Sequence, residues 1–147
     1  MVLMLKIVLD TNVLVSALIN PHGKPAQIIN YVFENKLRLF TSPSIIEEME
    51  RVLSYPKLMK RHGLEKEELR EFVSDLLSIM LLIEEEKTTE VIMEGPSDNK
   101  YLSCAINGKV DFIISGDIHL LNLGEYEGIQ IVTPTRFLQI MGGEEKA

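Results

Sequence analysis

The amino-acid sequence predicts a single α/β domain in which helices cover both faces of a mainly parallel central sheet of about five strands. Three observations favour this three-layer α/β/α class. Short apolar runs rich in β-branched residues alternate along the chain with segments of helical periodicity. The 147 residues, 46% of them apolar, suffice for one domain with a sizeable core. No repeat or linker divides the chain, so we expect the domain to span residues 1–141 and residues 142–147 to form a flexible tail.

The first third of the chain predicts two strands and two helices. Residues 5–9 are nearly all apolar, which is typical of a short strand buried on both faces. Residues 13–19 continue as an apolar run that is long enough for a buried helix. After a loop rich in proline and glycine, residues 26–34 place apolar side chains at helical spacing. Residues 37–41 then form the second expected strand.

The middle of the chain predicts two further helices and a strand. One helix is expected to start at residues 42–44 with a hydroxyl cap, because Glu47 follows Ser44 by three residues. The clearest helical pattern is at residues 67–80, where apolar side chains recur every three or four residues. Residues 81–83 are expected to form a strand before a solvated acidic run.

The last third of the chain completes the alternation. Residues 98–107 are expected to form a helix after a loop, and residues 111–115 a buried strand that turns at Gly116. Residues 129–132 are the last expected strand. Pro134 suits the first turn of a final helix, because a proline at that position loses no hydrogen bond.

The charge balance restricts the classes of function. Lys and Arg total 15 and Asp and Glu total 22, a net charge of −7. An acidic chain is unsuited to coating nucleic acid, which needs a basic surface. An enzyme that grips phosphates through bound divalent metal is not excluded, because such an enzyme must concentrate carboxylates.

The compartment is predicted from cysteine content and hydropathy. The single cysteine, Cys104, cannot form an intrachain disulfide and fits a reducing compartment; we interpret it as a small buried residue. The apolar N-terminus is interrupted by Lys6 and ended by Asp10, unlike a signal peptide. The longest other apolar stretch, residues 76–83, is far short of a bilayer span. We therefore expect a soluble cytoplasmic protein without membrane contact.

Four acidic residues are candidates for a common site. Asp10 and Asp117 each follow an expected strand, and ligands of open α/β sheets bind beyond the carboxyl ends of the strands. Asp98 begins an expected helix and shares a stripe with apolar residues, so it should face inward. Glu48 shares its stripe with apolar residues, whereas Glu47 shares a face with polar ones, which predicts Glu48 at the buried edge and Glu47 in solvent.

Carboxylates that converge in a partly buried site need a cation. Their mutual repulsion would otherwise raise their pKa values until some of them took up protons. Hard oxygen ligands select Mg²⁺ or Mn²⁺ over zinc, and the chain has no paired Cys/His pattern. Metal held in this way orients and activates water and stabilises a phosphoryl oxyanion. Phosphodiester hydrolysis is therefore the chemistry that the pattern favours.

Several short motifs resemble those of one family, the PIN-domain ribonucleases, which include many toxin components of toxin–antitoxin systems. The resemblance covers nearly the whole chain, and its main motifs occur in the family's order. They are Leu9-Asp10-Thr11-Asn12-Val13-Leu14, Ile46-Glu47-Glu48-Met49 with Val52-Leu53, Asp98-Asn99-Lys100, Ser115-Gly116-Asp117 with Leu120-Leu121, and Val132-Thr133-Pro134 with Phe137-Leu138. The chain departs from the family in one place, because Gly95, preceded by Glu94, stands where the family often carries another Asp.

The resemblance implies a PIN-like fold and a metal-dependent endoribonuclease of the toxin type. It makes Asp10, Glu48, Asp98 and Asp117 the metal-binding and catalytic acids, with Asn12 and Ser115 as polar residues that shape the site. The cofactor would be Mg²⁺ or Mn²⁺, the substrate RNA and the protein partner an antitoxin. A homodimer is also expected, from the family and from the high apolar content of a small chain.

Simpler interpretations remain open for each of these residues. Asp10 and Asp98 fit helix N-caps, Glu48 a surface acid and Asp117 a turn residue. The basic residues Arg51, Lys57, Lys60 and Arg61, with His62 beside them, form either a solvated face or a rim that contacts RNA. The three histidines show no metal-ligand spacing, and we interpret them as surface or structural residues.

Three other functions compete with a nuclease. An aspartyl-nucleophile phosphotransferase has a similar opening motif, but it needs a second Asp where Asn12 stands. A nucleotide-binding module would have a glycine-rich phosphate loop after a strand, and this chain has none. A receiver-like module would not need four converging acids. A catalytically silent PIN-like module that binds protein or RNA is the third alternative, and metal-dependent cleavage of RNA separates it from the enzyme.

Overall fold

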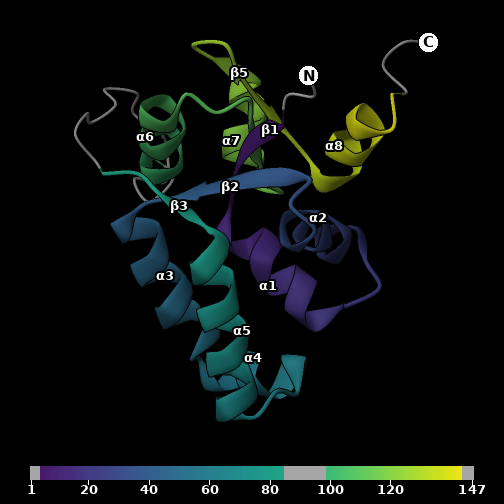
Figure 1. The fold of residues 1–147 in the computed structure, drawn as a ribbon, viewed down its shortest axis with the longest axis vertical. Helices are drawn as coiled ribbons and strands as arrows, with labels where there is room; N and C mark the ends of the chain where they lie inside the picture. Colours follow the sequence, from purple (N-terminus) through teal and green to yellow (C-terminus); the bar gives the residue numbers. More distant parts are fainter. Residues whose placement is uncertain (1–3, 85–98, 144–147) are drawn as a thin grey trace.

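The computed structural model describes residues 4–84 and 99–143 as one α/β domain (Figure 1). Its strands are β1 (Leu5–Leu9), β2 (Leu37–Thr41), β3 (Leu81–Leu82), β4 (Phe112–Ile114), β5 (Glu125–Tyr126) and β6 (Ile129–Val132). Its helices are α1 (Thr11–Ile19), α2 (Lys24–Phe33), α3 (Pro43–Leu53), α4 (Pro56–His62), α5 (Lys66–Ile79), α6 (Asn99–Gly108), α7 (Ile118–Leu123) and α8 (Pro134–Met141). The strands and helices predicted from the sequence are all found, with ends that differ by a few residues.

The strands form one sheet in the order β3-β2-β1-β4-β6-β5. The central strand β1 pairs in parallel with β2 and β4, and β4 pairs in parallel with β6, so the mainly parallel sheet is confirmed. The sequence predicted about five strands, and the sixth is β5, which pairs antiparallel with β6 through a tight hairpin. Glu127 and Gly128 have φ values of 49° and 84° in this turn. Glu125-Tyr126 contains no apolar run of the kind that predicted the other strands, which explains why sequence patterns missed it.

Neighbouring residues of β1 enter two separate cores on opposite faces of the sheet. Ile7 packs with residues of α1, α2 and α8, whereas Val8 packs with residues of α6 and α7. Both side chains are fully buried. This arrangement confirms the three layers, and it follows from the alternation of side chains along a strand.

Helices α3, α4 and α5 extend from one side of the sheet as a helical arm (Figure 1). Helix α5 confirms the expected pattern and begins with a capping box between Glu65 and Glu68. Helix α3 begins within the expected residues, with Ser42 as its N-cap and Pro43 as its first residue, but the expected hydroxyl cap is wrong, because no side chain caps the helix. Ser44 therefore already lies inside the helix, because proline is favoured at the first helical position. The short helices α4 and α7 were not predicted.

None of the helices in the described part of the chain combines the length and the hydropathy that crossing a bilayer would require.

Candidate active site

Asp10 lies at the carboxyl end of β1 and is almost fully buried. Its Oδ1 accepts a hydrogen bond of 3.0 Å from the backbone N–H of Asn12, so it caps α1. Its Oδ2 accepts a hydrogen bond of 2.7 Å from the hydroxyl of Ser115, which follows the neighbouring strand β4. The interpretation of Asp10 as a cap is therefore correct, but capping uses only one of the two carboxylate oxygens.

Ser115 connects Asp10 to Asp117. Its fully buried hydroxyl donates to Asp10 and accepts a hydrogen bond of 2.9 Å from the backbone N–H of Asp117. Asp117 in turn caps α7, accepting from the backbone N–H of His119 at 2.7 Å. The parallel pairing of β1 and β4 brings these residues together, as expected for adjacent strand ends.

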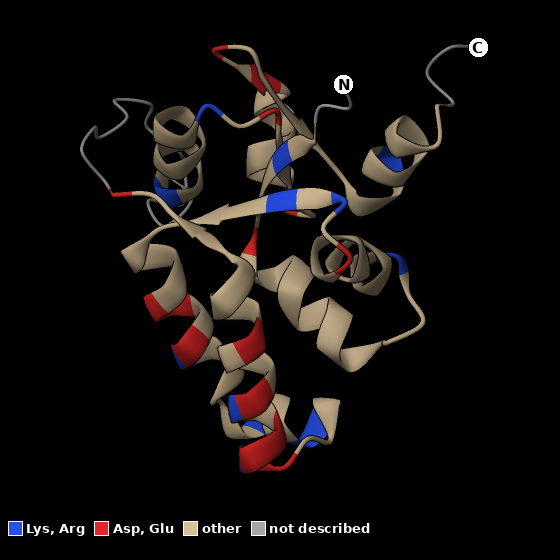
Figure 2. Cartoon of the chain, in the orientation of Figure 1, with Lys and Arg blue, Asp and Glu red and all other residues tan. Residues whose placement is uncertain are grey.

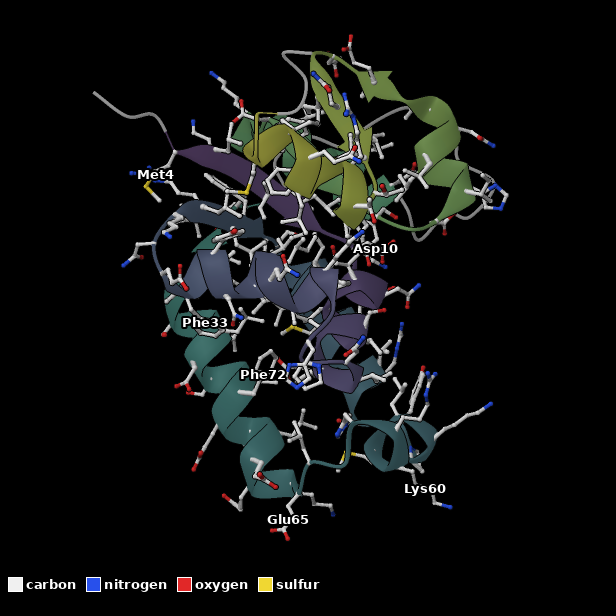
Figure 3. All side chains as sticks on the ribbon, turned by 90° about the vertical axis from the view of Figure 1, so that its right-hand side faces the viewer. Met4, Asp10, Phe33, Lys60, Glu65 and Phe72 are labelled. Atoms are coloured by element: carbon white, nitrogen blue, oxygen red, sulfur yellow. The ribbon has the colours of Figure 1, made fainter. Side chains whose placement is uncertain are left out.

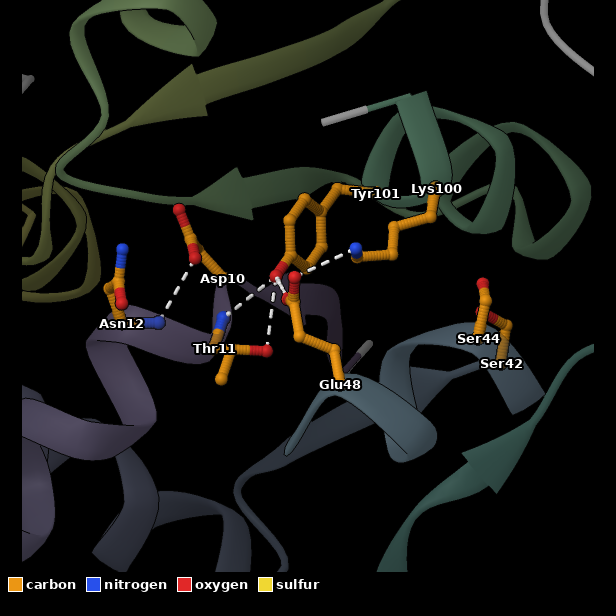
Figure 4. A network of polar contacts seen from close by, with 8 residues as sticks. All are labelled: Asp10, Thr11, Asn12, Ser42, Ser44, Glu48, Lys100 and Tyr101. Carbon is orange, nitrogen blue, oxygen red and sulfur yellow. Dashed lines mark hydrogen bonds and ion pairs between the residues drawn. The ribbon is translucent and has the colours of Figure 1, made fainter. Parts of the chain in front are cut away.

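Glu48 reaches the same edge of the sheet from α3 and is held there by α6 (Figure 4). Its Oε2 is 2.8 Å from the Nζ atom of Lys100, and both side chains are 16% exposed. Its Oε1 accepts a short hydrogen bond from the hydroxyl of Tyr101. The residue beside it, Glu47, is exposed, so the predicted phase of this helix is confirmed.

Tyr101 is anchored to the first turn of α1. Its hydroxyl accepts a hydrogen bond of 3.2 Å from the backbone N–H of Thr11 and lies 3.0 Å from Thr11 Oγ1. A tyrosine hydroxyl can donate only one hydrogen bond. Because a carboxylate is a stronger acceptor than a hydroxyl, we infer that Tyr101 donates this hydrogen bond to Glu48. The residue is 2% exposed, so packing holds its ring in place.

The protonation states of Glu48 and Tyr101 follow from these contacts. Partial burial raises the pKa of Glu48, but hydrogen bonds from Lys100 and Tyr101 and the charge of Lys100 outweigh it, so the net pKa is lowered from 4.5. Burial, the negative charge of Asp10 and the hydrogen bond to Glu48 all raise the pKa of Tyr101. Glu48 is therefore an anion at neutral pH, and Tyr101 is a neutral hydrogen-bond donor.

Three of the four predicted acids line one small cavity of about 130 Å³. Its lining residues are Asp10, Thr11, Asn12, Glu48, Val52, Tyr101 and Asp117. The fourth acid, Asp98, directly precedes α6 in the sequence. Both Asp98 and Gly95 lie outside the described residues. Sequence reasoning did not select Thr11, Lys100 or Tyr101 as site residues. The signal for Tyr101 was its place on the buried face of α6, because a buried tyrosine hydroxyl needs a partner.

The chemistry of the lining residues fits a hard divalent cation. Carboxylate oxygens come from three elements, and neither thiol nor imidazole lines the cavity. Three carboxylates against one lysine leave this edge of the sheet negatively charged. In residues 4–84 and 99–143, however, no three His, Cys, Asp or Glu side chains form a group that could hold a metal ion. A metal held here would take its remaining ligands from water, from Asp98, or from Glu48 after a rearrangement.

The predicted basic residues do not line the cavity. Arg51 is exposed on α3, and Lys57, Lys60 and Arg61 are exposed on α4, in the helical arm. Figure 2 shows acidic residues along α3 and α5 of the arm and basic residues on α4. In the side view of Figure 3, β1 runs toward Asp10, and Lys60 lies on the same side of the molecule at the end of the arm.

The chain is similar to known proteins over most of its length. The family model of the PIN domain matches residues 6–119. An uncharacterized protein of Methanocaldococcus jannaschii, MJ1680, is 34% identical over an alignment 143 positions long, and the aligned parts cover 92% of this chain and 90% of that protein. The chain belongs to the PIN-domain family. Proteins of this family are generally nucleases.

Two solved structures share the fold of this PIN domain. The crystal structure of PAE2754 from Pyrobaculum aerophilum has a TM-score of 0.59 and 16% identity, and the match covers 94% of this chain and 90% of that one. VapBC2 from Rickettsia felis, solved bound to a DNA fragment from its promoter, has a TM-score of 0.55 and 17% identity. The match covers 86% of this chain and 97% of that one. At these identities the likeness shows the fold alone.

Proposed function

We propose that this PIN domain is a divalent-metal-dependent endoribonuclease. The observation that supports this proposal best is that Asp10, Glu48 and Asp117 line one cavity at the carboxyl edge of the sheet. Burying acids together costs free energy unless a cation or hydrogen bonds compensate for it. Asp98, one residue before α6, is the fourth acid of the proposal, because Lys100 and Tyr101 of the same helix contact Glu48.

The proposed roles follow from the contacts of each residue. Asp10, Glu48, Asp98 and Asp117 would hold Mg²⁺ or Mn²⁺, which when bound activates water and stabilises charge on a phosphoryl oxygen. Ser115 orients Asp10 through the hydrogen bond to Oδ2, and Tyr101 orients Glu48. Asn12, exposed at the start of α1 and lining the cavity, would contact the substrate.

The basic residues of the arm are proposed to bind the RNA backbone. Arg51, Lys57, Lys60 and Arg61 are exposed, and Lys60 lies on the same side of the molecule as Asp10 (Figure 3). An RNA strand leaving the cavity toward this side would meet α4. Lysine and arginine bind phosphates through charge, which also offsets the repulsion between RNA and an acidic protein.

We further propose that the protein acts as a toxin-type nuclease in the cytoplasm, as a homodimer with an antitoxin partner. The fold it shares with VapBC2 supports this proposal, as do the apolar residues that remain exposed, including Phe33, Tyr55 and Ile118. Sedimentation at micromolar concentration tests the dimer, and a monomer there would contradict it. Recovery of a stoichiometric second protein after expression with the neighbouring genes tests the antitoxin.

A catalytically silent binding module is the second candidate function. The observation that favours it is the ion pair between Lys100 and Glu48, because it satisfies this acid without a metal. The two candidates differ in what metal does, since a silent module would bind RNA equally well with metal or with chelator.

A cleavage assay on pooled RNA decides between these candidates. The wild-type protein should cleave RNA with Mg²⁺ or Mn²⁺ and stop when a chelator is added. Asp10→Asn should remove cleavage, because it replaces a carboxylate while its side-chain oxygen can still cap α1. Glu47→Gln is the matched control, because this exposed acid of α3 lies outside the cavity. Equal cleavage by wild type and Asp10→Asn would contradict the proposed function.

A further inference from the structure

Lys100 is the only basic side chain of the described residues that is paired with an acid of the cavity. Its Nζ atom is 2.8 Å from Glu48 Oε2 and 5.6 Å from the centre of the Tyr101 ring. Only 16% of the side chain is exposed, unlike the exposed lysines of α4. The ammonium therefore sits between a carboxylate and the face of an aromatic ring, both of which favour a cation.

The two oxygens of Glu48 are held in different ways. Oε1 accepts from Tyr101, whose ring is buried and whose hydroxyl is fixed by the backbone N–H of Thr11. Oε2 contacts the end of a lysine side chain, which has a flexible four-carbon stem. One oxygen of Glu48 is thus fixed by the fold, whereas the partner of the other can change without any movement of the backbone.

We propose that Lys100 is the resident counter-ion of Glu48 and that a divalent metal ion must displace it in order to bind. An ammonium group has three donors and no acceptor, so it cannot join the ligands of a metal. It also repels a second cation that approaches the same carboxylate. Lys100 therefore lowers the metal affinity of the site and stabilises the metal-free protein. This inference rests on the proposed function, because it takes Glu48 as a metal ligand.

The pair explains how the acids are accommodated without metal. Glu48 is only 16% exposed, and the salt bridge with Lys100 and the hydrogen bond from Tyr101 give each of its two oxygens a partner. A divalent ion brings twice the charge of an ammonium and replaces it when its concentration is high enough. Removing the lysine should then have two opposite effects, a less stable metal-free protein and tighter metal binding.

The test compares Lys100→Gln with Lys109→Gln and Lys100→Arg. Lys109→Gln removes the same charge from an exposed lysine near the start of β4, at the edge of the sheet opposite the cavity. Lys100→Arg keeps the charge and adds a guanidinium fork that pairs more firmly with a carboxylate. Calorimetric titration with Mn²⁺ gives the Kd, and thermal melts with chelator and with saturating Mn²⁺ give the stability of each state.

We expect the Kd for Mn²⁺ to fall about tenfold in Lys100→Gln, equivalent to ~1.4 kcal/mol. It should stay unchanged in Lys109→Gln and rise in Lys100→Arg. In chelator, the melting temperature of Lys100→Gln should be lower than that of wild type. On addition of Mn²⁺, the melting temperature of Lys100→Gln should increase by more than that of wild type. A purely structural lysine would lower stability in both conditions and would not tighten metal binding.

The outcomes separate this inference from the proposed function. Mn²⁺ binding that is equal or weaker in Lys100→Gln than in wild type overturns the role of Lys100 and leaves the nuclease proposal standing. No Mn²⁺ binding by either protein overturns both proposals. Binding by Lys100→Gln alone supports the inference strongly, because the lysine would then block the site. If Lys100→Gln does not fold in chelator, an unchanged or lower Kd of Lys100→Arg overturns the inference.

Discussion

Glu48 and Glu47 are neighbours in sequence but have different surroundings. A helix turns about 100° per residue, so adjacent side chains of α3 point in different directions. Glu48 faces the cavity and contacts Lys100 and Tyr101, whereas Glu47 is exposed to solvent. The carboxylate of Glu48 is therefore partly desolvated and hydrogen-bonded, whereas that of Glu47 is hydrated.

Substituting these two acids one at a time tests that difference. Glu48→Gln should reduce metal-dependent RNA cleavage by orders of magnitude, because it keeps the shape of the side chain and removes a proposed ligand charge. Glu47→Gln should leave cleavage nearly intact and change the free energy of unfolding by less than about 0.5 kcal/mol, as is usual for surface substitutions. Cleavage rates and urea unfolding curves check both results. Equal loss of cleavage in the two variants would contradict the placement of Glu48 in the site.

The lowered pKa of Glu48 predicts a pH dependence of stability. A carboxylate whose pKa is lower in the folded than in the unfolded protein adds stability above the unfolded value, here 4.5. That contribution is lost as the pH falls below 4.5 and through the folded pKa. We expect metal-free Glu48→Gln to lose less stability than wild type between neutral pH and this acid range. Urea unfolding in chelator at several pH values measures the difference, and parallel pH profiles would contradict the prediction.

At the scale of elements, the site depends on how α6 docks against α1 and α3. Tyr101 of α6 contacts Thr11 at the start of α1 and Glu48 in α3, so one hydroxyl connects three helices. The pairing of β1 with β4 similarly places Asp10 beside Ser115. The arrangement of the acids is therefore set by the packing of whole elements.

Tyr101→Phe should weaken this junction while keeping the ring. It removes a hydrogen bond to an anion and leaves the buried backbone N–H of Thr11 without its acceptor, a loss of about 1–3 kcal/mol. Metal affinity should also fall, because Glu48 loses the contact that fixes Oε1. Tyr55→Phe is the control, since that tyrosine is exposed in the arm and should change little. Urea unfolding and Mn²⁺ titration measure both effects, and unchanged stability would contradict the assigned hydrogen bonds.

At the scale of the whole molecule, charge is distributed unevenly around an acidic protein. Acidic residues occupy α3 and α5, while α4 at the end of the arm carries Lys57, Lys60 and Arg61 (Figure 2). The net charge of −7 repels RNA at long range. A local basic surface on the side of the cavity would offset this repulsion where the strand passes.

The double substitution Lys60→Gln and Arg61→Gln tests that role. It should weaken RNA binding and reduce the dependence of the affinity on salt, because fewer phosphates are neutralised. Cleavage of saturating RNA should be preserved, since neither residue lines the cavity. Lys109→Gln with Lys6→Gln removes the same charge elsewhere and should have little effect. RNA-binding curves at several salt concentrations measure this effect. If the affinity of the double variant depended on salt as steeply as that of wild type, contact between α4 and RNA would be contradicted.

Local patterns were sufficient for much of the fold and for the placement of Asp10, Glu48 and Asp117 around one cavity. Apolar runs predicted five strands of the sheet, and helical phase alone distinguished Glu48 from Glu47. The positions of Asp10 and Asp117 after strands predicted that they meet at one edge of the sheet. These inferences succeeded because each depends on residues close in sequence, or on the general rule that parallel strands end at a common edge.

The hydrogen-bond partners of these acids come from distant parts of the chain. Tyr101 and Glu48 are 53 residues apart, Tyr101 and Thr11 are 90 apart, and Ser115 and Asp10 are 105 apart. No local pattern encodes such pairs, because they depend on how α6 packs against α1 and α3 and on how β4 pairs with β1. Apolar patterning and helical phase were enough to predict the fold class and the candidate carboxylates. The packing of α6 determined that Glu48 is already paired with a lysine and a tyrosine, because buried charge must find partners wherever the fold brings donors close.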